Sequence, residues 1–210
     1  APTGTGPKVL VAKVSGLLDP VLADFIESSI EKAENDGALA VVLQVNSSGS
    51  VLDDHRLQEL ASTIRDARVP VASWIGPTGS DAKGETAQLL ALTEPIGITG
   101  KSRIGDLGEI VIEGGDFGGR APRLVNSTVG KDEAVELGVA VPSDIIGDFL
   151  LRLPGFQSQD GQPITQSVFT EPDVVHELFH TVASPPIAYL LFLIGLGLLE
   201  AIPESRLHEL

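Results

Sequence analysis

The sequence predicts an α/β protein whose parallel sheet is covered by helices on both faces. Short Val-rich stretches alternate along the chain with longer amphipathic stretches, as expected for parallel strands joined by helical crossovers. The strand-like stretches are apolar almost without interruption, which is typical of strands buried on both faces. With 210 residues, of which 42% are hydrophobic, the chain is long enough to bury such a core.

The first strand–helix–strand unit occupies the N-terminal part of the chain. The Val-rich stretch 8–14 predicts a strand. Asp19 and Pro20 form a typical helix start, with an acidic cap before a proline in the first turn. Apolar residues at helical spacing then continue to the Asn-Asp-Gly stop at 35–37, and residues 38–45 predict the second strand.

The remaining elements continue the alternation. The predicted helices are 52–66, 85–92, 131–138 and 145–153, and the predicted strands are 69–75, 96–99 and 109–112. Residues 114–122 form a glycine-rich connector. Ligand sites of such sheets lie at the carboxyl ends of the strands, so we expect the site in the loops 46–50 and 76–83.

Charge and composition exclude several classes of function. The chain has 14 basic and 29 acidic residues, a net charge of −15. This balance predicts no nucleic-acid partner, because the chain has no excess of Lys and Arg to neutralise the phosphates of a nucleic acid. It contains no Cys, which excludes disulfides, iron–sulfur clusters and a Cys nucleophile. It begins at Ala1 and contains no Met, so we expect a mature chain after signal-peptide removal or an excised fragment.

The C-terminal part changes character. Residues 182–199 carry no charge and are long enough to span a bilayer, so we predict a transmembrane helix at 184–202; a buried core helix is the alternative. The expected organisation is therefore a flexible lead at 1–7, a domain at 8–156, a linker and juxtamembrane helix at 157–183, and the membrane helix.

One short motif has metal-ligand spacing. On a helix, His176 and His180 would share one face and could bind zinc while Glu177 acted as a general base. The motif lies between a polar stretch and the apolar stretch, with no third ligand in view. We therefore favour the polar face of a juxtamembrane helix and expect no metal or other cofactor.

The two loops at the strand ends are better candidates. The sequence Asn46-Ser47-Ser48-Gly49-Ser50 is small and flexible enough for its backbone amides to approach a ligand carbonyl, as an oxyanion hole requires. The second loop contains Gly79 and leads into the predicted helix at 85–92.

Read together, these stretches resemble the NfeD family, which are membrane-bound serine proteases of the ClpP class with a crotonase-like fold. Residues 45–50 stand where the family reads L-D-T-P-G-G, and residues 77–86 stand where it reads P-S-G-A-R-A-A-S-A-G. Residues 99–105 match A-P-G-T-x-I-G. Further downstream, 131–138 and 184–199 resemble a family helix and its first membrane span.

The resemblance also shows what this chain lacks. Gly84 stands at the position of the nucleophilic serine, and Ser50 at that of an oxyanion-hole glycine. The lysine that acts as the family's general base lies in the segment that corresponds to 106–127, where this chain has no Lys. The resemblance therefore implies an inactive protease domain that binds or scaffolds. It also implies stomatin- or flotillin-like membrane partners, self-association, and an extracytoplasmic domain anchored in a membrane.

Two enzymatic alternatives stay open at this point besides a zinc peptidase at His176, Glu177 and His180. A relocated dyad could use Ser80 with Lys83 or Lys101, provided that the hydroxyl and the amine are in contact. An acyl-thioester enzyme of the crotonase type needs no serine, but the phosphates of coenzyme A would meet a chain of net charge −15.

Overall fold

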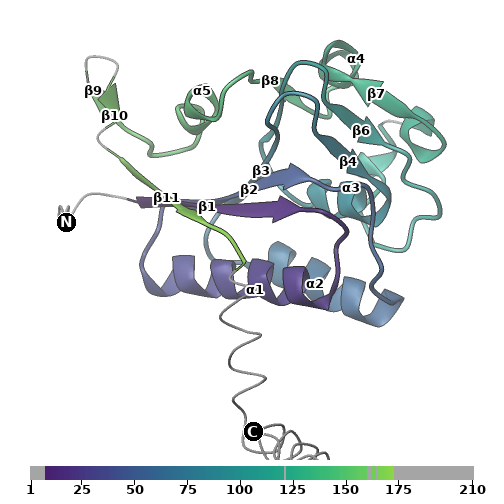
Figure 1. The fold of residues 1–210 in the computed structure, drawn as a ribbon, viewed down its shortest axis with the longest axis horizontal. Helices are drawn as coiled ribbons and strands as arrows, with labels where there is room; N and C mark the ends of the chain where they lie inside the picture. The colour runs from purple at the N-terminus through teal and green to yellow at the C-terminus, as the bar shows by residue number, and fades with distance from the viewer. Residues whose placement is uncertain (1–7, 121, 160–161, 164, 173–210) are drawn as a thin grey trace, which may run out of the picture. The chain divides into compact units, whose positions relative to one another are not determined.

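The computed structural model describes residues 8–120, 122–159, 162–163 and 165–172. All of them belong to the first of two compact units of the chain, Ala1–Pro172. Its centre is a six-stranded, all-parallel sheet in the order β11-β1-β2-β3-β5-β8 (Figure 1). These strands are β1 (Lys8–Ser15), β2 (Ala40–Asn46), β3 (Val71–Ile75), β5 (Ile96–Ile98), β8 (Val141–Pro142) and β11 (Gln166–Thr170).

Helices cover both faces of this sheet. Helices α1 and α2 lie together against one face, and α5 lies over the other (Figure 1). The helices are α1 (Pro20–Asn35), α2 (Asp54–Asp66), α3 (Gly84–Leu90), α4 (Lys131–Glu136) and α5 (Ile146–Leu150), with 3-10 turns at Phe117–Gly119 and Pro122–Val125. The predicted α/β class with a parallel sheet is confirmed.

The core consists of two apolar clusters, one on each face of the sheet. Alternate residues of β1 belong to opposite clusters: Leu10 packs on the side of α1, whereas Val11 packs on the side of Trp74 and Phe149. This division explains why β1, β2 and β3 are mostly apolar, because each strand packs against both clusters.

A smaller sheet adjoins the large one. It contains β4 (Asp81–Lys83), β6 (Arg103–Gly105) and β7 (Thr128–Gly130), in the order β4-β6-β7. The sequence predicted a loop at 76–83 and no element at 103–105 or 128–130. Each strand has three residues, too few to show an alternating pattern, so their pairing could not be expected from local sequence.

Residues 109–112, predicted as a strand, form an irregular segment instead. The buried side-chain amide of Gln88 takes the place of a neighbouring strand. It donates to the carbonyl oxygens of Leu107 (2.8 Å) and Glu109 (2.7 Å), and its oxygen accepts from the N–H groups of Val111 (3.0 Å) and Ile112 (3.1 Å). These backbone N–H and C=O groups therefore have hydrogen-bond partners although the segment does not pair with a strand.

The predicted linker also differs from the structure in its first half. Residues 158–163 include the short hairpin strands β9 (Ser158–Gln159) and β10 (Gln162–Pro163), and β11 then joins the large sheet beside β1. An edge strand faces solvent and can be polar, which explains why composition alone suggested a linker.

Within the described residues, no helix combines the length and the hydrophobicity that crossing a membrane requires. The predicted membrane helix at 184–202 lies outside those residues.

Candidate functional site

The two loops predicted from the strand ends lie side by side. The loop after β2 pairs with β4, which continues the loop after β3: the N–H of Ser47 donates to the Asp81 carbonyl (2.7 Å), and the N–H of Lys83 donates to the Ser47 carbonyl (3.2 Å). The side-chain oxygen of Asn46 also accepts from the N–H of Asp81 (3.1 Å). The carboxyl ends of β2 and β3 therefore build one site, as expected for a parallel sheet.

Gly84 stands at the centre of this site as the first residue of α3. Its backbone has a left-handed φ of +57°, and its N–H donates to the carbonyl of Asp106 (3.1 Å). A Cβ atom added at Gly84 would lie 3.5 Å from the Cα atom of Gly49, an ordinary van der Waals contact. A side chain at position 84 would thus lie against the loop that the sequence indicated for an oxyanion hole.

A cluster of buried hydroxyls fixes this loop to α3. The Ser47 hydroxyl donates to the Gly49 carbonyl (3.1 Å) and is 3.0 Å from the Thr86 hydroxyl, which also donates to that carbonyl (3.2 Å). Sequence reasoning did not single out Ser47 or Thr86. Nothing in the sequence distinguishes them from ordinary loop hydroxyls, because their partners lie 39 residues apart along the chain.

Gly49 adopts a φ of +142°, a conformation that only glycine adopts without strain. A Cβ atom placed on Gly49 would lie 3.9 Å from Oε2 of Glu85. The half-buried carboxylate of Glu85 therefore lies beside the loop. A negative charge there opposes the build-up of charge on a substrate oxygen. Glu85 was not a predicted site residue.

The other predicted loop residues have separate surroundings. The Ser50 hydroxyl donates to the Leu18 carbonyl (3.0 Å) and accepts from the N–H of Leu52 (3.0 Å), so it secures the loop to the first crossover. Ser48 is exposed. Gly79 has a φ of +86°, and its N–H donates to the Gly100 carbonyl (3.2 Å).

Solved structures with a similar architecture include membrane-bound proteases. A membrane-bound stomatin-specific protease, solved as a mutant in complex with a substrate peptide, is similar to this chain at a TM-score of 0.66 and 16% identity, covering 85% of this chain and 98% of that chain. This chain has the fold of that protease. No protein-family model matches the sequence, and no curated protein matches it either.

Two further solved structures, a protease and a hydratase, are similar to this chain in fold. A membrane protease specific for a stomatin homolog from Pyrococcus horikoshii has a TM-score of 0.62 and 16% identity, covering 85% of this chain and 99% of that chain. An enoyl-CoA hydratase from Thermoplasma volcanium GSS1 has a TM-score of 0.54 and 16% identity, covering 63% of this chain and 65% of that chain. The predicted ClpP- and crotonase-like fold is therefore confirmed.

The residues of the alternative dyad are not paired with each other. Ser80 is 2% exposed, and its backbone N–H donates to the Ser102 hydroxyl (3.0 Å). The ammonium group of Lys83 pairs with Asp81 instead (2.9 Å), and Lys101 is exposed in a left-handed turn with a φ of +63°. Over the described part of the chain, no hydrogen bond joins the Ser80 hydroxyl to either lysine.

The cations near the segment 106–127 have other partners. Lys131 pairs with Asp144 (3.0 Å), whose carboxylate also accepts from the N–H of Gly100 (3.1 Å). The Lys131 ammonium, and to a smaller extent the Gly100 N–H, hold the pKa of Asp144 below its usual range. Arg123 pairs with Glu133 (2.6 Å). The charges of Lys131 and Arg123 are thus each neutralised by a nearby carboxylate.

Metal chemistry has no candidate within the described residues, where no three His, Asp or Glu side chains are grouped to hold an ion. The motif of His176, Glu177 and His180 lies outside those residues.

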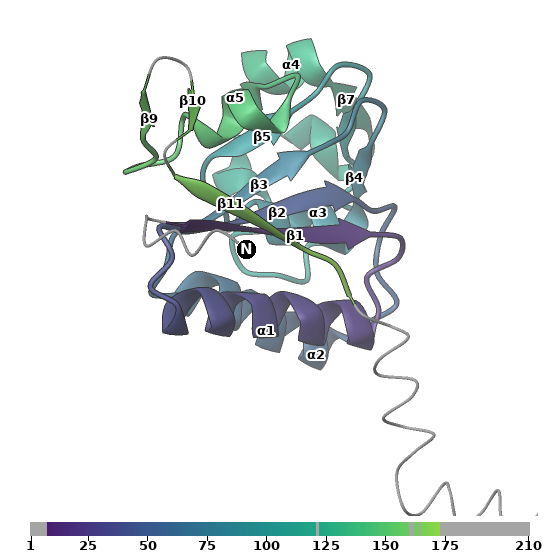
Figure 2. The same ribbon diagram turned by 60° about the vertical axis from the view of Figure 1, so that its left-hand side comes forward.

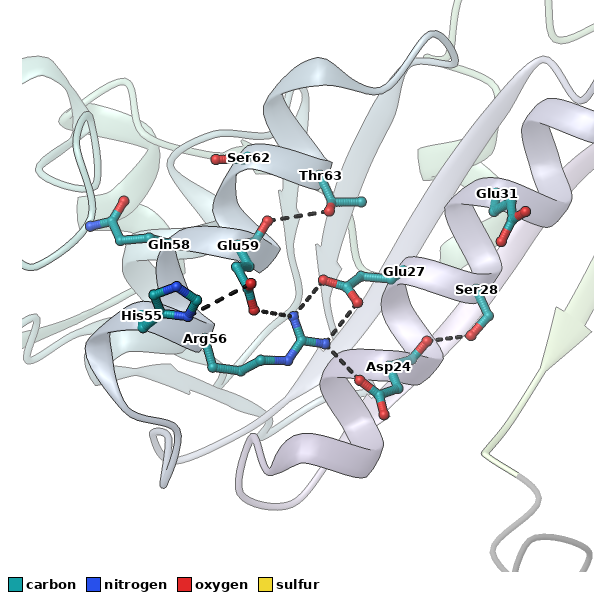
Figure 3. Close-up of a pocket in the computed structure, with 10 residues that line it drawn as sticks. All are labelled: Asp24, Glu27, Ser28, Glu31, His55, Arg56, Gln58, Glu59, Ser62 and Thr63. Atoms are coloured by element: carbon teal, nitrogen blue, oxygen red, sulfur yellow. Dashed lines mark hydrogen bonds and ion pairs between the residues drawn. The ribbon is translucent and has the colours of Figure 1, made fainter.

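A wide surface groove of about 900 Å³ lies between α1 and α2, apart from the strand-end loops (Figure 3). The guanidinium of Arg56 crosses it and pairs with Glu27 (2.7 Å) and Asp24 (2.6 Å), and both carboxylates raise the pKa of Arg56. His55 lies at the exposed helix start, 3.6 Å from Glu59. The ion pairs of Arg56 with Glu27 and Asp24 tie the two helices together.

Proposed function

We propose that this domain is a pseudoprotease, a ClpP-class domain that binds peptide segments of another protein without cleaving them. The observation that carries this proposal is Gly84. It is the first residue of α3, where the family resemblance places the nucleophilic serine, and glycine has no side chain that could attack a carbonyl.

Two further features support the absence of cleavage. The segment 106–127 contains no lysine that could act as a base, and Lys83 is held by Asp81. The carboxylate of Glu85 lies beside Gly49, where a protease must stabilise a developing negative charge. Loss of either a nucleophile or its base costs orders of magnitude in rate, so the loss of both supports a role other than catalysis.

Binding does not depend on those groups. Ser47 and Thr86 still fix the loop 46–50 against α3, so the backbone around Gly49 stays preorganised. Loops at the ends of parallel strands are the usual place for a ligand in such sheets, and Asn46 and Ser48 of this loop are exposed.

The partner that we propose is a stomatin- or flotillin-like membrane protein. The similar solved proteases are described as specific for stomatin or a stomatin homolog. We further propose that the uncharged stretch 182–199 anchors the chain in a membrane, with the domain on the extracytoplasmic side.

Fluorescence anisotropy with labelled, overlapping peptides that cover a stomatin homolog tests the binding site. Ser48→Arg adds a large side chain to the exposed loop and should abolish binding, whereas Ser62→Arg on the exposed face of α2 should leave it unchanged. Equal binding by the wild type and by Ser48→Arg would contradict this site, and binding of none of the peptides would contradict the partner class.

A further inference from the structure

Strand β11 forms an open edge of the large sheet. It pairs with β1 in parallel register, from Lys8 opposite Gln166 to Ala12 opposite Thr170 (Figure 2). Among the described residues, no strand lies on its other side. Its outward N–H and C=O groups are therefore available to another strand. The opposite edge, β8, has only two residues and ends in Pro142, which cannot donate a hydrogen bond.

The side chains of β11 suit it to pairing. Its sequence Q-S-V-F-T has no charge and no proline, although natural edge strands commonly carry such residues to prevent association. Val168 is 37% exposed and lies opposite Leu10, on the α1 side of the sheet. Phe169 is 59% exposed and lies opposite Val11, on the other side. Both faces of this edge thus offer apolar surface.

The neutral β11 edge lets a second copy of the chain approach as the occupant. Two molecules of net charge −15 repel each other wherever their acidic surfaces meet, and this repulsion is weakest at an uncharged segment such as β11. The next charged residue, Glu171, is already paired with Lys13 at 2.9 Å. Contact through this edge therefore places no unpaired like charges opposite each other.

We propose that two copies of this chain pair their β11 strands antiparallel about a two-fold axis and join their sheets into one. In the register centred on Val168, this residue faces its own copy, Ser167 faces Phe169 of the second copy, and Gln166 faces Thr170. All five residues pair, and every pair is uncharged. Such an interface is isologous, so it closes as a dimer, and the joined sheet then ends on each side in the two-residue strand β8.

Cysteine cross-linking tests the register directly, because the chain has no cysteine of its own. Directly opposed residues of antiparallel strands have Cα atoms about 4.5–5.5 Å apart, within the range that a disulfide spans. On mild oxidation, the full-length Val168→Cys chain should form a covalent dimer. The matched control Leu151→Cys, at a residue 52% exposed on the α5 side, should form no covalent dimer. Equal cross-linking of the two variants would overturn the proposal.

Sedimentation of the full chain, in a detergent that keeps its apolar stretch dissolved, tests the interface without a cross-link. The wild type should sediment as a dimer, and Phe169→Glu should raise the dimer dissociation constant at least tenfold. Leu151→Glu adds the same charge elsewhere and should leave the dimer intact. A monomeric wild type, or a dimer that Phe169→Glu does not weaken, would overturn the proposal.

Discussion

Replacing Gly84 with serine restores the missing hydroxyl, and we expect it to cost stability without producing a protease. At φ +57°, a residue with a Cβ atom is strained by about 1–2 kcal/mol. Packing adds little to this cost, since the new Cβ atom would lie 3.5 Å from the Cα atom of Gly49. Urea unfolding of Gly84→Ser should therefore show a free energy of unfolding lower by about 1–2 kcal/mol.

Gly37→Ser is the matched control for this change. Gly37 follows the end of α1 with a φ of +63°, and a Cβ atom added there meets nothing within 4 Å. Gly37→Ser therefore introduces the backbone strain without a new contact, and the two variants should lose similar amounts of stability. A loss at Gly84 several kcal/mol larger would show that the contact with Gly49 does not tolerate a side chain.

The same Gly84→Ser protein decides whether the nucleophile is the only missing part. No lysine lies in the segment 106–127, and Glu85 places a negative charge nearby, so we expect no peptide cleavage above the wild-type background. Cleavage that appears in Gly84→Ser would refute this reasoning, because it would reveal a working base and oxyanion hole in the natural chain.

Three further changes test the supports of the site. Thr86→Val leaves the Ser47 hydroxyl with one partner fewer and should cost about 1–3 kcal/mol in urea unfolding while weakening peptide binding. Gln88→Leu leaves four backbone groups without a partner, so it should cost about 3 kcal/mol or more and speed amide hydrogen exchange in residues 107–112. Asp144→Asn should reduce the stability lost between pH 7 and pH 3 in urea unfolding. The pairing with Lys131 lowers the folded pKa of Asp144, so its contribution is present above the unfolded pKa of about 4 and disappears as the pH falls through the lower folded value.

Each of these variants has an exposed counterpart. Thr63→Val removes a hydroxyl on α2, Gln58→Leu removes a single exposed hydrogen bond to the same loop that Gln88 holds, and Asp148→Asn removes an exposed carboxylate on α5. All three should change the free energy of unfolding by less than about 0.5 kcal/mol. An effect as large as that of the partner variant would mean that burial and pairing do not determine the cost.

Local signals predicted the first half of the fold well. The Asp19 cap, Pro20 and the stop at 35–37 match the observed α1, Pro20–Asn35, in which Asp19 accepts from the N–H of Leu22 at 2.8 Å. The Val-rich strands β1, β2 and β3 were also predicted within a few residues. Helix caps and hydrophobic periodicity involve residues that are close together in the sequence, so they can be recognised in one sequence alone.

Elements that depend on distant partners were missed. The strands β4, β6 and β7 have three residues each and exist because of one another. The edge strand β11 pairs with β1 across most of the chain. Strands of these kinds have no periodic pattern of their own, so the sequence indicated a loop in place of β4 and a linker in place of β11.

The candidate site divides in the same way. The loops around Gly49 and Gly84 follow from the rule that sites lie at strand ends, and the structure brings them together. The contributions of Ser47, Thr86 and Glu85 depend on how two loops face each other in space. No local pattern distinguishes them from solvent-facing residues, and only the folded chain shows their contacts.

The central claim is that this chain binds peptides without cleaving them. Mass spectrometry of a diverse peptide library, incubated with the purified 210-residue chain with and without a metal chelator, tests it most directly. We predict intact peptides in both samples, while labelled peptides bind to the wild type and not to Ser48→Arg. Cleavage that survives the chelator and disappears in Ser80→Ala would contradict the claim in favour of a relocated serine dyad, and cleavage abolished by the chelator would contradict it in favour of zinc at His176 and His180.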